Sequence, residues 1–579
     1  MGAGPVAPRD PVPLRDFSDS PLPVTPIWDA PETAWHAAYP EGMPPRIEFE
    51  AVRAERLLES AVNRYPDRLA LRYFKTAWTY EELLVRVKIA AASLQRVGVH
   101  CGSRLMLVLP NCPEFIVLWF AAHWLGAEVV PANPLVSSSE LVHLAKKCNI
   151  DTVAGLDVRL KPIGKMSRQV PVRNLITVSL APHLPWFLAI PYQLQKLVKG
   201  RAAIADDTNV MSFGEFFDTT RSINLPALND VDQPAVLQPT GGTTGSSKVA
   251  VLTHRNLCSN VAQLHTWSGL EPGTDTFLSV LPYFHIYGAT CAMLSPLVGG
   301  STLLIQARFH PYITTRLIQK YKPTVALLVP FMIKALNEVM RKKNIRLDSL
   351  KRCMSGASPL AEDDAREFEA RTGAIILEGF GLSEASPVTH SNPADGSARI
   401  GSIGLPLPNT EVKLVDLETG LLPVAPGEIG ELAIRGPQVM QGYLDDPIET
   451  AIALRQGWLY TGDVAVMSHD GFFEIVDRKK DMIISGGLNV FPSEVEEVLL
   501  KHASIEACAV VGQPDRKYGE LVCAFVVPVA GASIDVKEVR EFCRDELSGY
   551  KIPKEVRIVD ELPETFLGKI RRVELRKAA

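Results

Sequence analysis

The chain of 579 residues has 60 lysine and arginine residues against 65 aspartate and glutamate residues, a net charge of −5 and a pI near 6.2. This balance excludes a nucleic-acid-binding protein that works through a broadly basic surface. Hydrophobic residues make up 46% and charged residues 22% of the chain, which is typical of a globular protein and excludes a disordered one. The length is sufficient for several domains, each with its own core.

The nine cysteines are scattered along the chain, with no Cys-x-x-Cys pair and no spacing typical of a zinc site. We therefore expect reduced thiols, no structural metal and a cytoplasmic location. Residues 1–46 are rich in proline and contain no apolar run like that of a signal peptide, so we expect an irregular lead-in.

From residue 47 onward, apolar runs alternate with turn signals. Residues 104–109 predict a buried strand, residues 115–125 an apolar helix and residues 127–131 the next strand. Strands that alternate with helices in this way favour a parallel, doubly wound α/β body.

Two stretches without formal charge raise the question of a membrane. Residues 277–307 include several glycines and prolines, and a buried α/β core explains them better than a helix facing lipid. Residues 174–195 contain three prolines, so a regular spanning helix is not expected. Because Trp186, Phe187 and Tyr192 precede a basic stretch, that segment suits either the surface of an anionic membrane or a loop whose aromatic rings pack on the protein.

The composition changes at residues 400–476, where glycine and proline separate short runs of alternating polar and apolar residues. This pattern predicts short antiparallel strands in a small barrel-like subdomain. The charged stretch at residues 477–481 marks the expected domain boundary. After it a new pattern begins, with a helix over residues 492–501 that we expect Ser493 to cap.

The segment with the strongest chemical signal is Thr240-Gly-Gly-Thr-Thr-Gly-Ser-Ser-Lys248, which follows a predicted strand. Glycines let backbone N–H groups approach a phosphate, hydroxyl groups add donors and Lys248 adds a positive charge. It is not a Walker A loop, because Ser247 stands where that motif has glycine. A loop of this composition, taken alone, is equally consistent with a flexible surface loop.

The complete string resembles the phosphate loop of the adenylate-forming enzymes, which include acyl-CoA synthetases, firefly luciferase and the adenylation domains of peptide synthetases. Five further stretches resemble motifs of this superfamily in the same order, namely residues 355–359, 379–384, 460–463, 477–481 and 563–570. The resemblance covers roughly residues 47–579. It implies an α/β N-terminal domain over residues 47–479, with two doubly wound sheets and the barrel-like subdomain, and a mobile α+β C-terminal domain over residues 480–579.

The resemblance also implies a site for ATP and AMP. Phe380 would stack on adenine, Asp463 would accept hydrogen bonds from the ribose, and Glu384 with Thr244 would hold Mg²⁺. The residues implied to bind the nucleotide are Thr240, Gly241, Gly242, Thr243, Thr244, Gly245, Lys248, Gly356, Ala357, Ser358, Glu378, Gly379, Phe380, Gly381, Ser383, Asp463 and Arg478.

The implied catalytic residues are Lys569, Thr244, Glu384 and His285. Lys569 would bridge the carboxylate of the acid and the α-phosphate, and would neutralise charge as the two approach. Lys480 matches the pivot between two orientations of the C-terminal domain, and Ser485, Gly486 and Gly487 would line the channel for CoA. Outside these motifs, each of these residues would be read as an ordinary core or surface residue.

The substrate is indicated by two further regions. Residues 281–288 lack the aspartate with which relatives that activate amino acids pair the substrate's ammonium group, which speaks against an amino acid. Residues 457–480 resemble the signature of fatty acyl-CoA synthetases, and residues 35–44 and 174–195 resemble the bacterial long-chain branch. The resemblance implies that ATP activates a medium- to long-chain fatty acid to acyl-AMP, with release of pyrophosphate, and that the acyl group then passes to CoA.

Several alternatives stay open. A fatty acyl-AMP ligase, or a CoA ligase for an aryl or other specialised acid, would share these motifs, and a non-catalytic acyl- or nucleotide-binding protein belongs to a different class. Only ten residues follow Lys569, so no fused carrier domain is expected there. Val249 in place of glycine and Glu564 in place of a basic residue depart from the family pattern. We also leave open a homodimer and a peripheral contact, through residues 174–201, with the inner face of the cell membrane.

Overall fold

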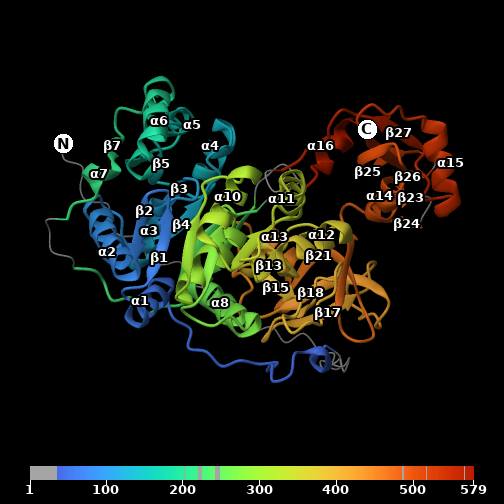
Figure 1. The fold of residues 1–579 in the computed structure, drawn as a ribbon, viewed down its shortest axis with the longest axis horizontal. Helices are drawn as coiled ribbons and strands as arrows, with labels where there is room; N and C mark the ends of the chain where they lie inside the picture. The colour runs from blue at the N-terminus through green and yellow to red at the C-terminus, as the bar shows by residue number, and fades with distance from the viewer. Residues whose placement is uncertain are drawn as a thin grey trace.

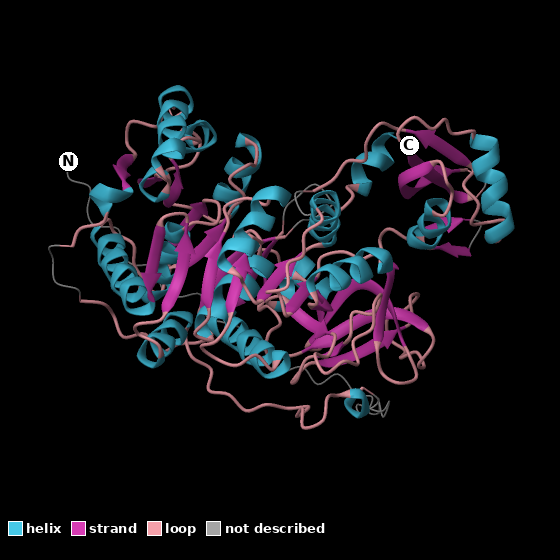
Figure 2. Ribbon diagram, viewed as in Figure 1, coloured by secondary structure: helices cyan, strands magenta, loops and turns pink. Residues whose placement is uncertain are grey.

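A computed structural model describes residues 35–200, 202–219, 224–240, 248–485, 488–516, 518–565 and 568–578 of the chain. These residues form two large, mainly parallel sheets, a smaller antiparallel sheet and a separate C-terminal domain (Figure 1). Helices lie against the sheets (Figure 2). The predicted α/β fold class, with two sheets in the large domain and an α+β C-terminal domain, is confirmed.

The first large sheet has nine strands in the order β16-β15-β14-β13-β12-β10-β11-β1-β2. Its central strands pair in parallel, and antiparallel pairs occur at both edges. The strands are β1 (Leu69–Tyr73), β2 (Thr76–Thr79), β10 (Thr276–Ser279), β11 (Thr302–Ile305), β12 (Val325–Leu328), β13 (Arg352–Ser355), β14 (Ile375–Gly381), β15 (Val388–Ser391) and β16 (Leu405–Pro406).

The second large sheet has eight strands in the order β19-β9-β8-β4-β3-β5-β6-β7. The hairpin β8–β9 flanks the predicted phosphate loop, and the distant strand β19 returns to pair with β9. The strands are β3 (Arg104–Val108), β4 (Glu128–Pro131), β5 (Thr152–Leu156), β6 (Asn174–Val178), β7 (Asn209–Ser212), β8 (Pro234–Pro239), β9 (Val249–Thr253) and β19 (Gly442–Tyr443).

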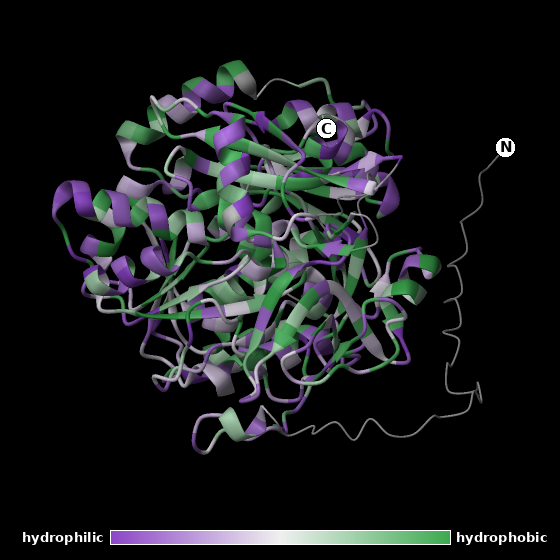
Figure 3. Ribbon diagram, turned by 90° about the vertical axis from the view of Figure 1, so that its right-hand side faces the viewer, coloured by the Kyte–Doolittle hydropathy of each residue, from purple (hydrophilic) through white to green (hydrophobic). Residues whose placement is uncertain are grey.

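The helices of the large domain pack apolar faces on these sheets, and the strands are mainly green in Figure 3 while the outer helices carry more purple. Helix α3 is buried along its whole length, and none of its residues is exposed to solvent. The helices are α1 (Ala54–Arg64), α2 (Tyr80–Arg96), α3 (Pro113–Trp124), α4 (Ser138–Lys147), α5 (Leu160–Ser167), α6 (Trp186–Lys199), α7 (Phe213–Phe216), α8 (His254–Ser268), α9 (Ser295–Val298), α10 (Pro311–Tyr321), α11 (Pro330–Lys343), α12 (Glu362–Thr372) and α13 (Pro447–Ala453).

The uncharged stretch at residues 277–307 forms part of the buried core, as predicted. It contains β10, the π-helix η3 (Tyr287–Leu294), α9 and β11, and almost all of its residues are buried. A π-helix is rare and is frequent at functional sites, and this one begins two residues after His285.

The other uncharged stretch forms β6 and then α6, which contains Pro191 and projects from the large domain beside α5 (Figure 1). Among the described residues, no helix combines the length and the apolar character that crossing a membrane requires. Trp186 and Phe187 are exposed, so the alternative in which these two rings pack on the protein is wrong for them. Tyr192 does pack on the protein, where its hydroxyl donates to Oδ1 of Asp157 at 2.5 Å.

The antiparallel subdomain forms where the glycine- and proline-rich texture predicts it. Its strands are β17 (Glu411–Val415), β18 (Ile429–Arg435), β20 (Leu454–Arg455), β21 (Trp458–Met467) and β22 (Phe473–Arg478). The order is β17-β18-β21-β20, and β22 pairs with β21 so that Asp463 lies opposite Arg478. This register brings two residues of separate motifs side by side.

The C-terminal domain has a five-stranded sheet of β23 (Ile483–Ser485), β24 (Leu488–Val490), β25 (Ile505–Asp515), β26 (Gly519–Pro528) and β27 (Glu555–Ile558). Its helices are α14 (Pro492–Leu500), α15 (Val536–Glu546) and α16 (Arg572–Ala578). The predicted capping role of Ser493 is wrong: Phe491 is the N-cap and Pro492 starts the helix. The Ser493 hydroxyl donates instead to the Val476 carbonyl at 2.7 Å, because proline suits the first helical position and places the serine inside the first turn.

Candidate active site

The motif at residues 460–463, predicted to bind ribose, and the charged stretch at residues 477–481, the predicted hinge, meet on the paired strands β21 and β22. Nε of Arg478 lies 2.8 Å from Oδ1 of Asp463, which is buried. Within the described part of the chain, Oδ2 of Asp463 is buried and has no hydrogen-bond partner. Burial raises the pKa of Asp463, against the effect of the nearby cations Arg478 and Lys569. A buried acceptor without a partner is suited to a hydroxyl group of a ligand.

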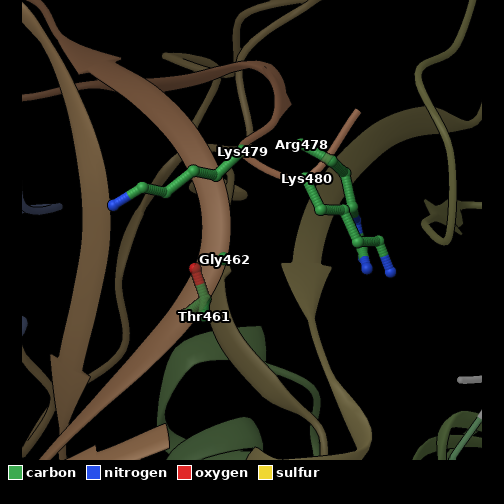
Figure 4. A pocket seen from close by; sticks show the side chains of 5 residues that line it. All are labelled: Thr461, Gly462, Arg478, Lys479 and Lys480. Atoms are coloured by element: carbon green, nitrogen blue, oxygen red, sulfur yellow. The ribbon is translucent and has the colours of Figure 1, made fainter. Parts of the chain in front are cut away.

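The hinge residues line a cavity of about 280 Å³ together with Thr461 and Gly462. In Figure 4 the side chains of Arg478 and Lys480 run alongside each other, whereas Lys479 points the opposite way. The ammonium group of Lys479 pairs with Oε2 of Glu431 at 2.7 Å, so this side chain stabilises the antiparallel subdomain. Burial and the charge of Arg478 lower the pKa of Lys480.

Lys569 reaches this cluster from the C-terminal domain. Its backbone N–H donates to Oγ1 of Thr565 at 3.1 Å, and its carbonyl accepts from the Thr565 N–H at 2.7 Å. Although the residue is exposed overall, desolvation and the charge of Arg478 lower its pKa to about 8, against the effect of Asp463 and Glu384. The structure therefore brings the motif lysine within electrostatic reach of both motif carboxylates.

Gly568 gives the Lys569 turn its shape. Its φ of +77° lies in the left-handed region, and a Cβ there would approach Cδ1 of Phe331 on α11 to 3.2 Å. Two features favour glycine here, namely the left-handed backbone conformation and the close packing of the two domains.

His285 lies on the large-domain side of the same site. It is half-buried, and its ring centroid lies 4.8 Å from that of Phe284. Desolvation and the nearby Lys569 lower its pKa to about 4, so the imidazole is neutral at physiological pH.

The residues predicted to lie beside adenine are found where β13 and β14 end. Gly356 follows β13, and a Cβ on it would lie 3.3 Å from the Tyr287 hydroxyl and 3.4 Å from the Gly379 carbonyl. Ala357 has a φ of +78° and turns the chain toward Ser358. The Phe380 ring is half-buried and meets the buried ring of His390 edge-on, with centroids 6.1 Å apart.

Neighbouring motif residues on β14 have different surroundings. Glu378 is buried, and its carboxylate accepts from the Gly401 N–H at 2.8 Å, so this side chain holds a loop. A Cβ at Gly381 would collide with the Pro387 carbonyl oxygen, 2.2 Å away. Ser383 opens the short 3₁₀-helix η4 (Ser383–Ala385), which contains Glu384.

The side chain of Glu384 is fixed by Tyr443, which lies outside the family motifs. The Tyr443 hydroxyl donates to Oε1 of Glu384 at 2.8 Å, and the Met440 N–H donates to the Glu384 carbonyl at 2.7 Å. Burial and the charge of Glu384 raise the pKa of Tyr443. The described residues contain no group of three or more histidine, cysteine, aspartate or glutamate residues arranged to hold a metal.

The ends of the predicted phosphate loop meet at the hairpin β8–β9. The Thr240 N–H donates to the Lys248 carbonyl at 2.8 Å. Nζ of Lys248 lies 2.5 Å from Oε2 of Glu449 and 5.0 Å from the centroid of the Tyr443 ring. Val249, the departure from the family pattern, is fully buried in β9. Gly241, Gly242, Thr243, Thr244 and Gly245 lie outside the described residues.

The predicted CoA residues lie in the C-terminal sheet. Ser485 is buried in β23, where it pairs with Leu488 and Gly519. Gly486 and Gly487 lie outside the described residues. Glu564 is exposed and forms a bridge with Ile570, which closes the turn that presents Lys569.

Tyr443, Glu449 and Tyr287 line this site without being selected from the sequence. Tyr443 and Glu449 lie in the stretch after Gly436 that sequence patterning assigns to strands and turns, and neither stands at a spacing with a chemical meaning of its own.

Comparisons with known proteins agree with this geometry. Residues 58–444 match the family of AMP-binding enzymes, and residues 494–569 match the C-terminal domain of AMP-binding enzymes. A long-chain-fatty-acid–CoA ligase of Bacillus subtilis (strain 168) is 37% identical over 544 residues, which cover 93% of this chain and 97% of the relative. A feruloyl-CoA synthase of an Amycolatopsis species is 34% identical over 513 residues, or 88% of this chain and 96% of the relative.

Solved structures share the architecture. The crystal structure of ATP-bound MatB from Rhodopseudomonas palustris superposes with a TM-score of 0.76 at 26% identity, covering 91% of this chain and 99% of that chain. The chain therefore belongs to the AMP-binding enzyme family, within the adenylate-forming superfamily that its motifs predict.

Proposed function

We propose that this enzyme activates a medium- to long-chain fatty acid with ATP and transfers the acyl group to CoA. The observation that carries the proposal is that Lys569 of the C-terminal domain lies near enough to Asp463, Glu384 and His285 for their charges to influence one another's pKa. The long-chain-fatty-acid–CoA ligases among the relatives support this acid class.

In the first half-reaction, a carboxylate oxygen of the acid attacks the α-phosphorus of ATP, and the bond to the departing pyrophosphate breaks. The ammonium group of Lys569 would lie between the two anions and reduce their repulsion. Asp463 would accept hydrogen bonds from the ribose hydroxyls through its buried oxygen. The neutral imidazole of His285 would lie beside the carboxylate without adding charge.

In the second half-reaction, the thiolate of CoA attacks the acyl carbonyl and AMP leaves. We propose that the C-terminal domain turns about Lys480 between the two steps and presents Ser485, Gly486 and Gly487 to the pantetheine arm. The charge of residues 477–481 and the exposure of Lys480 within them support such a movement.

Glu384 would be a protein ligand of Mg²⁺, with Thr244 as the second. Its carboxylate offers the hard oxygen that this ion prefers, and Mg²⁺ commonly takes its other ligands from nucleotide phosphates and water. When bound, the ion supplies charge neutralisation for the pyrophosphate. Tyr443 would orient the Glu384 carboxylate for this role.

The test is release of AMP and pyrophosphate from ATP, with acids from acetate to oleate and with aryl acids, in the presence and absence of CoA. Turnover that requires both a long-chain acid and CoA is the expected result. Exchange of pyrophosphate that depends on the acid, without turnover on addition of CoA, would instead identify an acyl-AMP ligase.

A second candidate is a CoA ligase for an aryl acid, since the feruloyl-CoA synthases are similar over 88% of this chain. The same panel distinguishes the two candidates. A ratio of kcat/KM that favours an aryl acid over every fatty acid would replace the first candidate by the second.

We further propose that α6 seats the enzyme on a membrane surface. The α6 face opposite Tyr192 is apolar and exposed, and it comprises Trp186, Phe187, Ile190, Leu194, Leu197 and Val198. The surrounding residues 157–201 include eight lysines and arginines and one acidic residue, a net charge of +7 in a chain of net charge −5. An apolar face among cationic residues suits an anionic bilayer.

Co-sedimentation with phosphatidylglycerol vesicles tests this contact. The double variant L194S/L197S should lose most of the bound fraction, whereas L421S, at an equally exposed leucine of the antiparallel subdomain, should keep it. Retention by both variants would overturn the membrane contact. A concentration-dependent dimer that the double variant abolishes, without vesicle binding by the original chain, would assign the face to a second copy.

A further inference from the structure

An ion pair holds the last residue of the phosphate-loop motif. Nζ of Lys248 lies 2.5 Å from Oε2 of Glu449, and the two side chains are 26% and 36% exposed. Neither partner is deeply buried, so a ligand can reach the pair from solvent. The same ammonium group that the motif offers to a phosphate is therefore already matched to a carboxylate of the chain itself.

The surrounding hydrogen bonds fix Glu449 in place. Strand β19 pairs with β9, and the Leu444 N–H donates to the Val249 carbonyl at 2.8 Å, which attaches the segment next to Lys248. Asp446 then caps α13 by accepting from the Glu449 N–H at 3.1 Å. Glu449 therefore lies in the first turn of a capped helix, and its contact with Lys248 is built into the fold rather than left to a loose side chain.

Tyr443 connects this pair to the carboxylate of Glu384. Its ring lies 5.0 Å from Nζ of Lys248, within the range of a cation–π interaction, and its hydroxyl donates to Glu384. Its N–H donates to Oγ1 of Thr450, one residue after Glu449. One short segment thus contacts the motif lysine and the motif carboxylate together.

We propose that Glu449 is an internal competitor of the nucleotide's polyphosphate for Lys248. This inference rests on the proposed function, because it assigns Lys248 to the β- and γ-phosphates of ATP. A phosphate that approaches Lys248 meets the like charge of Glu449 and has to displace it or share the ammonium group with it. Glu449 therefore weakens the binding of ATP and of the product pyrophosphate, and it speeds the release of pyrophosphate.

The test is calorimetric titration of the full chain and of the variant Glu449→Gln with ATP, inorganic pyrophosphate and AMP. A partly exposed ion pair contributes up to about 1 kcal/mol, so the variant should bind ATP and pyrophosphate about two- to fivefold more tightly. AMP lacks the β- and γ-phosphates, and its Kd should not change. In steady state, inhibition by pyrophosphate should become stronger by the same factor.

Two controls separate the outcomes. Glu362→Gln removes the same charge from an exposed pair with Arg366 on α12 and should leave all three Kd values unchanged. In a Lys248→Met background, Glu449→Gln should have no further effect, since the competitor has lost its target. Equal tightening of AMP, or tightening that persists without Lys248, would overturn the inference. If the original chain bound neither ATP nor AMP, the proposed function itself would fail.

Discussion

The two domains contribute to the candidate site in different ways. On the large-domain side, Asp463, Glu384 and Lys248 are each held by a partner side chain, namely Arg478, Tyr443 and Glu449. On the C-terminal side, the turn that carries Lys569 is held by its own backbone and by packing of Gly568 on Phe331. One half of the site is a fixed array of charges, and the other half is a single charge on the turn that carries Lys569.

This difference matters because the two half-reactions have different needs. In the proposed mechanism, nucleotide binding needs an array that stays in place through both steps, whereas the charge of Lys569 is needed when the acid meets the α-phosphate. Variants of the fixed half should therefore affect both half-reactions, and variants of the turn that carries Lys569 should affect the first alone. Four predictions follow this division from the largest expected effect to the smallest.

Replacing Lys569 by alanine should separate the two half-reactions most sharply. Loss of one preorganised charge at the reacting centre typically costs roughly 10²- to 10³-fold in rate, and acyl-AMP formation should fall by this factor. Thioester formation from supplied acyl-AMP and CoA should largely survive. Single-turnover assays of each step measure this, with Lys577→Ala on α16 as the matched control. An equal loss in both steps would refute the assigned role.

Replacing Asp463 by asparagine should instead weaken both steps. Hydrogen bonds to a charged group contribute about 1.5 to 3 kcal/mol, so the affinity for AMP should fall roughly 10- to 100-fold. Folding stability should hold or increase, because burial already opposes the ionised carboxylate and raises its pKa. Calorimetry with AMP and thermal unfolding check the two parts. Unchanged AMP binding would contradict the ribose assignment.

The pH dependence of the first step should report the charge of Lys569. Because its lowered pKa is about 8, Lys569 is mostly charged below about pH 7, half charged at pH 8 and increasingly neutral as the pH rises further. The kcat/KM of adenylation, which reports the free enzyme, should therefore fall about fifteenfold between pH 8 and pH 9.5. The thioester step from supplied acyl-AMP should lack this ionisation. A kcat/KM that is flat to pH 10 would exclude a lowered pKa.

Replacing Gly568 by alanine should have the smallest effect of the four. The left-handed φ of +77° costs a residue with a Cβ about 1 kcal/mol, and the new methyl group meets Phe331. We expect about a fivefold loss of adenylation with normal thioester formation. The double variant G568A/F331A should recover the part due to close packing. Complete recovery would show that backbone conformation contributes nothing.

Much of the fold was predictable because local patterns determine it. The strands at residues 104–108 and 128–131 and the buried core at residues 277–307 follow directly from apolar runs between turn signals. The family motifs are continuous in sequence, so the residues around Asp463, Glu384 and Lys569 could be selected before their positions were known. The convergence of Asp463 with Arg478 then follows from the register of one hairpin.

The features that escaped prediction depend on contacts between distant segments. Glu449 meets Lys248 across 201 residues, and Tyr443 meets Glu384 across 59, distances at which no periodicity carries information. The local pattern fits Ser493 as a helix cap, but its hydroxyl donates to the Val476 carbonyl on β22 instead. Local rules fail where segments distant in the sequence meet in the fold.

The direction in which α6 faces has a practical consequence. Tyr192 and Lys196 attach one side of the helix to Asp157, so its apolar side remains in contact with water. Such a surface lowers the tension of any interface that it covers, and the protein should adsorb to air–water and plastic surfaces with α6 foremost. Sulfate, which strengthens apolar association, should promote this adsorption, and mild detergent should suppress it. We expect the orientation of particles on cryo-EM grids to reflect this exposed face.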